Sequence, residues 1–422
     1  MRVPSELANQ FGASFEELIT QFSIENGLLP DSQSISSTRF LSRSVVPHIK
    51  KLSTLFNRIE QENQNSGLNP YWKESANPAH LRLAYFLYFM PCNMFRCASV
   101  FTELSRLGFQ WNANPVLRGI EFGAGPAPGT TSAALANQIL PFKLPHSGSW
   151  ALIEQDKNML RLGKAWVESY IHSRIVHPSP ESPPLDWEIR PFHRKISLSE
   201  GFLPRNAPKF NLWIFSFFLN EFSESPTEIA ESLMNTWERH LEENGIVIII
   251  EPALKMQSRK LLEIRKELIQ IKEKRKNDWL KILLPCLGEQ SCGALSKKED
   301  WCHEEVSWWR PPYFRIIDQM AELDRKTLPF SYLVLTRSEK NLEEILPRLS
   351  QFETQNRYRL VSPAHSEGRD LEFFVCGEEG KRRARYRPVS ADETVDRGDI
   401  LVETKLQGEP EATRINETKR VE

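Results

Sequence analysis

The stretch "GIEFGAGPAPGTTSAALA", residues 119–136, joins an apolar strand pattern to a helical pattern through Gly123, Gly125 and Gly129. Glycine carries no Cβ and a helix N-terminus offers free N–H groups, so a cofactor can approach the backbone closely at such a turn. Glycine-rich turns also occur for purely structural reasons. No Lys-Ser or Lys-Thr follows the glycines, which excludes a Walker-type phosphate loop.

An acidic residue ends the strand pattern that follows the glycine turn: "SWALIE" finishes at Glu154. A carboxylate at that strand end is placed to accept hydrogen bonds from a ribose diol. Glu121 before the glycines and Pro126 within them resemble the first motif of class I S-adenosylmethionine-dependent methyltransferases more than a dinucleotide fingerprint. Ala127 stands where a third glycine is usual. We therefore predict S-adenosylmethionine as the cofactor, with the binding residues Glu121, Gly123, Gly125, Ala127, Gly129 and Glu154.

Strand and helix patterns alternate from residue 116 onward, which favours a parallel sheet covered by helices. A long helix pattern fills residues 251–280 after the fifth strand. The expected fold class is α/β, a doubly wound class I methyltransferase sheet. Its predicted strands are residues 116–122, 149–154, 185–192, 210–219, 245–251, 330–337 and 370–377.

Three segments follow from these patterns. Residues 1–112 have apolar residues at three- and four-residue spacing and form an N-terminal helical region. Residues 113–380 form the methyltransferase-like domain, with a cysteine-rich insertion at 277–329. Residues 381–422 form a basic extension and a frayed tail with little apolar surface.

The end of the fourth strand reads "FLNEF" and offers Asn220 and Glu221 as catalytic candidates. Methyltransferases often carry their chemistry at this strand end, but the same residues could simply cap the next helix. The segment has neither an Asn- or Asp-Pro-Pro-aromatic motif nor a nucleophilic cysteine. The sequence thus favours cofactor binding over any particular methyl transfer.

Three of the six cysteines, Cys286, Cys292 and Cys302, lie in one turn-rich segment. Such a loop can wrap thiolates around a metal, and the fourth ligand would be Cys376 or His303. The first choice gives a four-cysteine site suited to an iron–sulfur cluster, and the second a zinc site. The spacing lacks the paired knuckles of most zinc ribbons, which favours iron–sulfur. Unliganded thiols remain the alternative, and the helical pattern around Cys92 and Cys97 predicts buried packing residues.

Taken together, "EFGAGPAPGT", "FLNEF", "IIIEPALKMQSRKLLEIRKEL", the cysteine loop and "FSYLVLTRS" resemble the methyltransferase-like assembly proteins of the small ribosomal subunit in bacteria and mitochondria. The resemblance spans roughly residues 80 to 387. It implies a class I methyltransferase fold, binding to the small subunit or its rRNA, and a [4Fe-4S] cluster. By this resemblance the cluster ligands are Cys286, Cys292, Cys302 and Cys376, with His303 beside them.

Two basic segments are candidates for RNA contact. The long helix carries many cations around an apolar stripe, partly balanced by glutamates, as on an ordinary solvated helix face. The second segment, "KRRARYR", follows Cys376 directly, and arginines with a tyrosine suit phosphate contact and base stacking. The predicted RNA-binding residues are Lys381, Arg382, Arg383, Arg385 and Arg387.

The overall charge points to no partner, because 54 basic residues face 55 acidic ones among 422. The longest apolar run, "LAYFLYFM", is too short to span a bilayer, and the N-terminus lacks the pattern of a targeting segment. We expect a soluble cytoplasmic protein with no membrane partner, monomeric when free.

Three functions remain open at this point. The first is a protein that binds S-adenosylmethionine and small-subunit rRNA during ribosome assembly, with a structural [4Fe-4S] cluster. The second is an active rRNA methyltransferase using Asn220 and Glu221. The third is a zinc-stabilised methyltransferase of a small molecule.

Overall fold

The computed structural model describes most of the chain, and the segment before the first strand is helical there, as predicted. The described residues are 5–58, 78–111, 113–141, 143–173, 184–351, 357–377, 380–388, 394–403, 406–407, 413–415 and 418–420. The N-terminal elements are α1 (Ser5–Asn9), α2 (Ala13–Glu25), α3 (Thr38–Ser44), α4 (Val46–Arg58), α6 (Pro78–Ala84), the π-helix η1 (Tyr85–Phe89) and α7 (Met90–Arg106).

The first sheet carries the order β3-β2-β1-β4-β5-β8-β6, with β7 paired to β8. Strands β1 to β5 are parallel, whereas β6, β7 and β8 pair antiparallel. Strand order reverses between β1 and β4, and ligands of doubly wound sheets bind beyond the carboxyl ends of the strands at such a point. The strands are β1 (Leu117–Phe122), β2 (Ser147–Glu154), β3 (Asp186–His193), β4 (Phe210–Ser216), β5 (Leu241–Pro252), β6 (Leu280–Leu284), β7 (Glu304–Ser307) and β8 (Thr327–Arg337).

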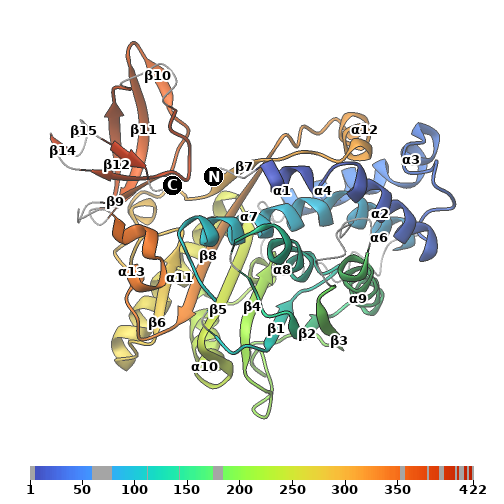
Figure 1. Cartoon of the computed structure of the whole chain (residues 1–422), viewed down its shortest axis with the longest axis horizontal. Helices are drawn as coiled ribbons and strands as arrows, with labels where there is room; N and C mark the ends of the chain where they lie inside the picture. Colours follow the sequence, from blue (N-terminus) through green and yellow to red (C-terminus); the bar gives the residue numbers. More distant parts are fainter. Residues whose placement is uncertain are drawn as a thin grey trace.

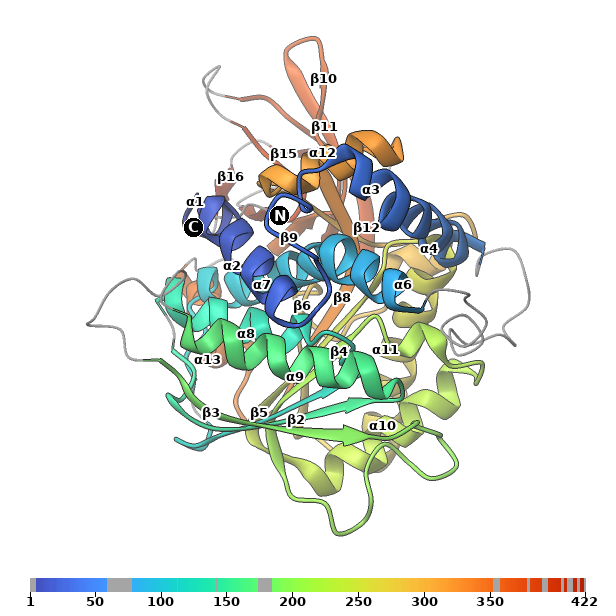
Figure 2. The same cartoon turned by 90° about the vertical axis from the view of Figure 1, so that its right-hand side faces the viewer.

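Helices cover both faces of this sheet (Figure 2). Successive strand residues point to opposite faces. On β4, Leu212 and Ile214 pack into the core under α7, α8 and α9, while Trp213 and Phe215 pack under α10 and α11. The chain therefore has the three-layer class I methyltransferase fold that the sequence predicted. The covering helices are α8 (Pro128–Ile139), α9 (Lys157–His172), α10 (Pro226–His240) and α11 (Lys255–Arg275).

The strand at Asp370–Gly377 forms as predicted, but it belongs to a second sheet. In the first sheet, the strands that pair with β8 beside β5 are instead β6 and β7, which lie in the cysteine-rich segment. Local alternation of apolar residues identifies a strand, but only long-range pairing assigns it to a sheet. The strand prediction therefore failed in the sheet assignment of residues 370–377 and in missing β6 and β7.

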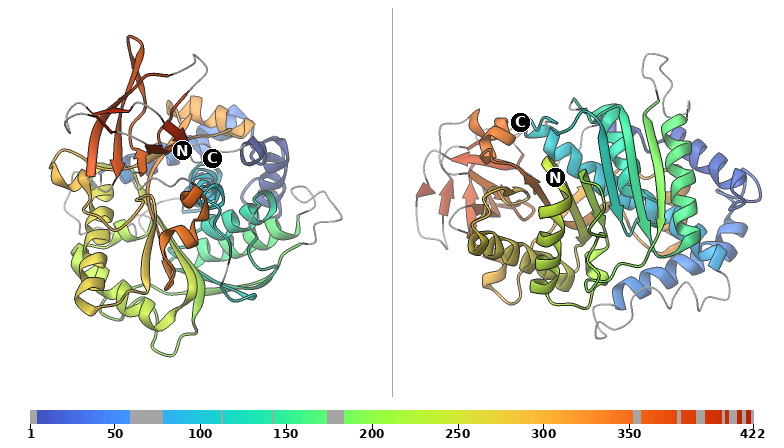
Figure 3. Two further views of the ribbon diagram at one scale, coloured as in Figure 1. Left: turned by 60° about the vertical axis from the view of Figure 1, so that its left-hand side comes forward. Right: turned by 90° about the horizontal axis from the view of Figure 1, so that it is seen from below.

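The second sheet lies at one end of the molecule, and the N-terminal helices lie at the other (Figures 1 and 3). Its order is β14-β15-β12-β11-β9-β13-β16, with β10 paired to β11. It runs across the predicted boundary at residue 380 and includes strands in the segment expected to be a tail. Its strands are β9 (Arg357–Leu360), β10 (His365–Glu367), β11 (Asp370–Gly377), β12 (Gly380–Tyr386), β13 (Ile400–Glu403), β14 (Leu406–Gln407), β15 (Thr413–Ile415) and β16 (Thr418–Arg420).

Short helices complete the described fold. Within the residues described, no helix has the length and apolar character needed to cross a membrane. The remaining elements are η2 (Leu219–Glu221), η3 (Gly293–Ser296), α12 (Pro312–Ala321), α13 (Leu342–Ile345) and η4 (Pro347–Gln351).

Candidate cofactor site and cysteine centre

The glycine loop between β1 and α8 is tightly packed. Gly123 and Gly125 have φ of 61° and 51°, and a Cβ added to Gly123 would lie 2.6 Å from the Phe218 ring. Ala127 adopts the left-handed conformation directly before α8, with φ of 57°. A Cβ on Gly125 would meet nothing closer than 3.9 Å, so space is free over that residue.

Glu121 holds this loop from below and does not face the site. Its side chain is completely buried and accepts hydrogen bonds from the Gly129 N–H (2.9 Å), the Thr130 N–H (2.8 Å) and the Thr130 hydroxyl (2.7 Å). Burial raises the pKa of Glu121 to about 7, although these donors oppose the shift. Gly129 is buried as well. Both residues therefore shape the loop from inside.

Glu154 lies at the end of β2 on the open side of the loop. One carboxylate oxygen accepts the Gly125 N–H (2.9 Å), and the other accepts the Asp156 N–H (2.8 Å). Each oxygen keeps a lone pair for a further donor. Burial raises the pKa of Glu154. The carboxylate thus ties the loop to β2 and can still accept ribose hydroxyls.

Glu251, which the sequence analysis missed, orders the end of β4. Its carboxylate accepts the N–H groups of Leu219 (2.7 Å), Phe218 (3.2 Å) and Asn220 (3.3 Å). The Asn220 amide, oriented to satisfy its donors, gives hydrogen bonds to Glu251 and to the Phe217 carbonyl. Burial raises the pKa of Glu251 to about 8. The only sequence signal was a single acid at the end of the apolar run "GIVIIIE".

Of the two catalytic candidates, Glu221 has the side chain that is free of hydrogen bonds to described residues. It is half-buried in η2, and no hydrogen bond to its side chain forms within the described part of the chain. Burial, together with the carboxylates of Glu154 and Glu251, raises its pKa to about 8. Asn220, in contrast, has its amide engaged by its neighbours.

The N-terminal helical region supplies the opposite wall. Arg96 on α7 lies with its guanidinium carbon 5.4 Å from the centre of the Phe217 ring, and it donates to the Asn93 side chain at 2.8 Å. Asn93 in turn lies 3.5 Å from the Tyr85 hydroxyl. Burial and the nearby carboxylates of Glu154 and Glu221 raise the pKa of Tyr85. A charged residue inside the apolar pattern around residues 88–101 was the available signal for this wall.

These elements meet in one place, which we call the strand-end site. Most of their neighbours are buried, but the site residues are half-buried and therefore reached by solvent. They come from η1, the glycine loop, the end of β2 and the end of β4, at the switch point of the sheet. The strand-end site consists of Tyr85, Gly123, Gly125, Glu154, Phe217, Asn220 and Glu221.

The four predicted cysteine ligands also come together. Burial raises the pKa of Cys302 well above its usual range, and the thiols of Cys286, Cys376 and Cys292 raise it further. Burial, Cys286 and Cys292 likewise raise the pKa of Cys376 to about 12. In the described residues, no group of three or more His, Cys, Asp or Glu side chains has the arrangement of a metal-ion site.

Backbone contacts hold the loop against the second sheet. A Cβ on Gly293 would lie 2.4 Å from the Lys381 nitrogen, so Cys292 lies beside the start of β12. Lys381 pairs with Cys376 in the β11–β12 register, and its ammonium group lies 2.7 Å from the Asp300 carboxylate. The Gln290 amide donates to the Gly377 carbonyl at 3.3 Å.

The long helix α11 anchors the same loop. Buried Arg265 donates to the carbonyls of Gly288 (2.8 Å) and Gln290 (3.1 Å), and Arg259 donates to the Asp300 carbonyl (2.6 Å). Lys272 forms a salt bridge with Glu289 at 2.5 Å. The sequence predicts an ordinary solvated basic face for this helix, but these three cations hold the cysteine segment.

The groups that act most on the charge of His303 include none of the four clustered cysteines. Burial, and then Arg397, lowers its pKa to about 4, and its Nδ1 has no hydrogen-bond partner among the described residues. Its ring stacks on Trp301 with centroids 6.0 Å apart.

The predicted RNA segment forms β12, and its cations are paired. Arg383 and Arg385 contact Glu372, Arg387 contacts Asp370, and Lys381 contacts Asp300. Arg382 lies opposite Val375 on the neighbouring strand. The segment therefore presents less net positive charge than its sequence suggests.

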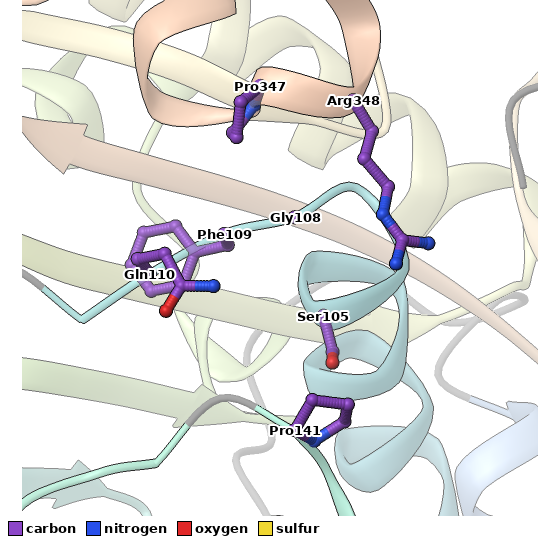
Figure 4. Close-up of a pocket in the computed structure, with 7 residues that line it drawn as sticks. All are labelled: Ser105, Gly108, Phe109, Gln110, Pro141, Pro347 and Arg348. Atoms are coloured by element: carbon purple, nitrogen blue, oxygen red, sulfur yellow. The ribbon is translucent and has the colours of Figure 1, made fainter.

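Two cavities lie away from both sites. One, of about 280 Å³, opens where α7 ends beside Pro347 and Arg348 (Figure 4). The other, of about 670 Å³, lies along α2. Neither is lined by a residue that the sequence analysis singled out.

A family model described as "mitochondrial small ribosomal subunit Rsm22" matches residues 83–387, more than half of the chain. The chain belongs to this family. The Rsm22 match runs from the end of α6 to just beyond β12, and so includes the strand-end site and all four clustered cysteines. Its description names mitochondria and does not confirm the predicted cytoplasmic location.

No curated protein matches the chain. Similar solved structures include a ribosomal protein L11 methylase from Lactobacillus delbrueckii subsp. bulgaricus, at 12% identity over 57% of this chain and 80% of that chain, with a TM-score of 0.27. An O-methyltransferase from Bacillus cereus in complex with SAH has 6% identity over 71% and 96%, with a TM-score of 0.29. Similarities this low say nothing about the activity of the Rsm22-family chain.

Proposed function

We propose that this chain binds S-adenosylmethionine at the strand-end site and acts in biogenesis of the small ribosomal subunit. The observation that carries the proposal is the meeting of Gly125, Glu154 and Glu221 at the switch point of a methyltransferase-type sheet. Membership of the Rsm22 family supports the ribosomal part.

The charge of the strand-end site fits this cofactor better than a dinucleotide. Carboxyl groups of Glu154, Glu221 and Glu251 influence one another there. A pyrophosphate would add like charge to this group, whereas the sulfonium and ammonium of S-adenosylmethionine are cationic. The free space over Gly125 accommodates an approaching ligand.

Bound S-adenosylmethionine would supply an electrophilic methyl group. In this proposal Glu154 accepts hydrogen bonds from its ribose hydroxyls and keeps the glycine loop closed onto β2. Glu121 and Glu251 hold the backbone on either side, and neither touches the ligand.

A titration of the purified chain with S-adenosylmethionine tests the cofactor proposal. Glu154→Gln should bind roughly 10-fold more weakly or worse, because a charged hydrogen-bond acceptor is lost. Glu231→Gln, an exposed change on α10, should bind like wild type. Failure of the wild-type chain to bind the cofactor would overturn the proposal.

We further propose that Cys286, Cys292, Cys302 and Cys376 hold a [4Fe-4S] cluster. Support comes from the mutual effect of the four thiols on their pKa values and from the anchoring of the loop to β11 and β12. Four thiolates would also hold Zn²⁺. Anaerobic purification with metal and sulfide analysis should give about four irons per chain. Zinc without sulfide would contradict the cluster.

For rRNA, we propose that β12 makes the contact through Lys381, Arg382, Arg383, Arg385 and Arg387. Phosphates would have to compete with Glu372 and Asp370 for the arginines. Replacing Arg383 and Arg385 together with Gln should weaken binding to small-subunit rRNA and reduce its salt dependence. An unchanged salt slope would contradict this role.

Active methyl transfer to rRNA is the second candidate, and the uncommitted carboxylate of Glu221 favours it. A carboxyl group with a raised pKa can take a proton from an acceptor during transfer. The measurement is incorporation of labelled methyl groups into small-subunit rRNA by wild type and by Glu221→Gln. Incorporation that the variant retains in full would remove Glu221 from the reaction.

A further inference from the structure

Arg96 is a buried cation without a carboxylate partner in the described part of the chain. Its side chain is 6% exposed in the middle of α7, and every described neighbour along that helix turn is buried as well. Its one hydrogen bond to a described residue goes to Asn93, and its Nε has no partner. Burying a charged group is costly unless another group compensates it.

No salt bridge joins Arg96 to a carboxylate among the described residues, and its side chain donates to Asn93. Burial lowers the pKa of Arg96 to about 10, and the groups that act most on its charge are Cys92, Arg325, Cys97 and Tyr85. Arg325 adds a second positive charge to this region. Among the described residues, the guanidinium of Arg96 therefore has no carboxylate partner, and it lies in a helix whose residues from Met90 to Leu104 are all buried.

The location of Arg96 connects it with the strand-end site. The guanidinium lies over the ring of Phe217, which is half-buried at the end of β4. Arg96 donates to Asn93, and the Asn93 amide lies beside the Tyr85 hydroxyl, which is close to Glu154 and Glu221. On α7, the next residue, Cys97, lies 3.8 Å from the hydroxyl of Ser216, the last residue of β4.

We propose that Arg96 binds the carboxylate of the methionine portion of S-adenosylmethionine. The inference rests on the proposed cofactor function and adds the direction in which the ligand lies in the site. Glu154 at the end of β2 would take the ribose, so the methionine portion would extend toward β4 and α7. The ligand carries two cationic groups and one carboxylate, and the site offers acidic side chains together with one guanidinium.

This arrangement also assigns a task to the N-terminal helical region. Arg96, Asn93 and Tyr85 belong to η1 and α7, outside the strand-and-loop elements that carry the glycine motif. Short π-helical segments such as η1 are often found at functional sites. The cofactor would thus be held between the sheet and the helices that precede it.

The test compares two ligands that differ only in the carboxylate, S-adenosylmethionine and its decarboxylated form. Wild type should prefer S-adenosylmethionine by about 10- to 100-fold, the usual range for a desolvated charge-assisted hydrogen bond. Arg96→Met should lose that preference while keeping its affinity for the decarboxylated ligand. Arg96→Lys, which retains the charge but not the planar fork, should keep part of the preference.

Equal affinity of wild type for the two ligands would overturn the assignment and leave the proposed function intact. This comparison needs no variant, so it stands even where Arg96→Met fails to fold. Equal loss of both ligands in a folded Arg96→Met protein would likewise overturn it and make Arg96 a packing residue. Binding of neither ligand to wild type would overturn the assignment and the cofactor function together.

Discussion

At the scale of single residues, three carboxyl groups in or beside the strand-end site have raised pKa values. Glu121, Glu221 and Glu251 have pKa values of about 7, 8 and 8, raised from 4.5 chiefly by burial. Each favours the folded chain only while it is protonated. Their contribution to stability is therefore complete below about pH 4.5 and lost as the pH rises through 7 and 8.

This linkage predicts that the free energy of unfolding falls as the pH rises from about 4.5 to about 8 and levels off above that. Glu221→Gln should flatten the dependence, because one of the ionising groups is gone. Urea unfolding at several pH values measures this effect, with Glu231→Gln as the control. Identical slopes for wild type and Glu221→Gln would contradict the assignment.

Some residues of the proposed site could be placed from the sequence, and others could not. Glu121, Gly125 and Glu154 lie at or just beyond strand ends in a recognisable order, so local pattern was enough to place them there. Glu251 and Arg96 are single charges within apolar runs. Their importance depends on what the fold brings against them, and no local pattern encodes that.

At the scale of elements, α11 and the cysteine segment form one unit. Sequence periodicity predicted the helix and its apolar side, and Leu261, Ile264 and Leu268 are buried as that pattern requires. The same periodicity assigned its cations to solvent. The structure instead uses Arg259, Arg265 and Lys272 to hold the loop that carries three of the cysteines.

Arg265→Met should therefore release the loop while leaving the cysteines in place. The carbonyls of Gly288 and Gln290 would lose a charged donor, at a cost of about 1.5–3 kcal/mol for each such bond. We expect less iron per chain after anaerobic purification and several-fold faster loss of iron to a chelator. Lys266→Met, an exposed neighbour on the same helix, is the matched control. Wild-type iron retention in Arg265→Met would show that the anchor is dispensable.

At the scale of the whole molecule, a buried ionic group joins the two sheets. Arg359 on β9 of the second sheet is 3% exposed and contacts Glu103 on α7 at 2.9 Å and Glu304 on β7 at 3.4 Å. It also donates to the Tyr332 hydroxyl on β8 at 3.0 Å. Residue 359 pairs with Cys376 in the β9–β11 register, so this group lies next to the cysteine centre.

Glu103→Gln should be strongly destabilising, by about 3–5 kcal/mol, because Arg359 would keep a buried charge without its main partner. Arg106 and Arg359 hold the pKa of Glu103 down at about 2 despite burial, so its contribution is present above about pH 4.5 and lost as the pH falls toward 2. Chemical denaturation at about pH 7 measures the loss. A change below about 1 kcal/mol would mean that the Arg359–Glu103 contact contributes little to holding the two sheets together.

The fold of the whole molecule was predictable where neighbours in sequence are neighbours in space. The alternation of strand and helix patterns from β1 to β5 predicted the parallel sheet and the end of it at which the glycine turn lies. Apart from β11, the strands of the second sheet were not predicted, because most of them are short and some pair across long sequence separations, as β9 does with β13. The basic strand β12 was foreseen as a segment, but its acidic partners on β11 were not.

The central claim is that the strand-end site binds a cationic sulfonium cofactor. Parallel titrations of the wild-type chain with S-adenosylmethionine and with a nicotinamide dinucleotide test it most directly. We predict binding of one S-adenosylmethionine per chain and no measurable binding of the dinucleotide. Binding of the dinucleotide, or absence of S-adenosylmethionine binding, would contradict the account.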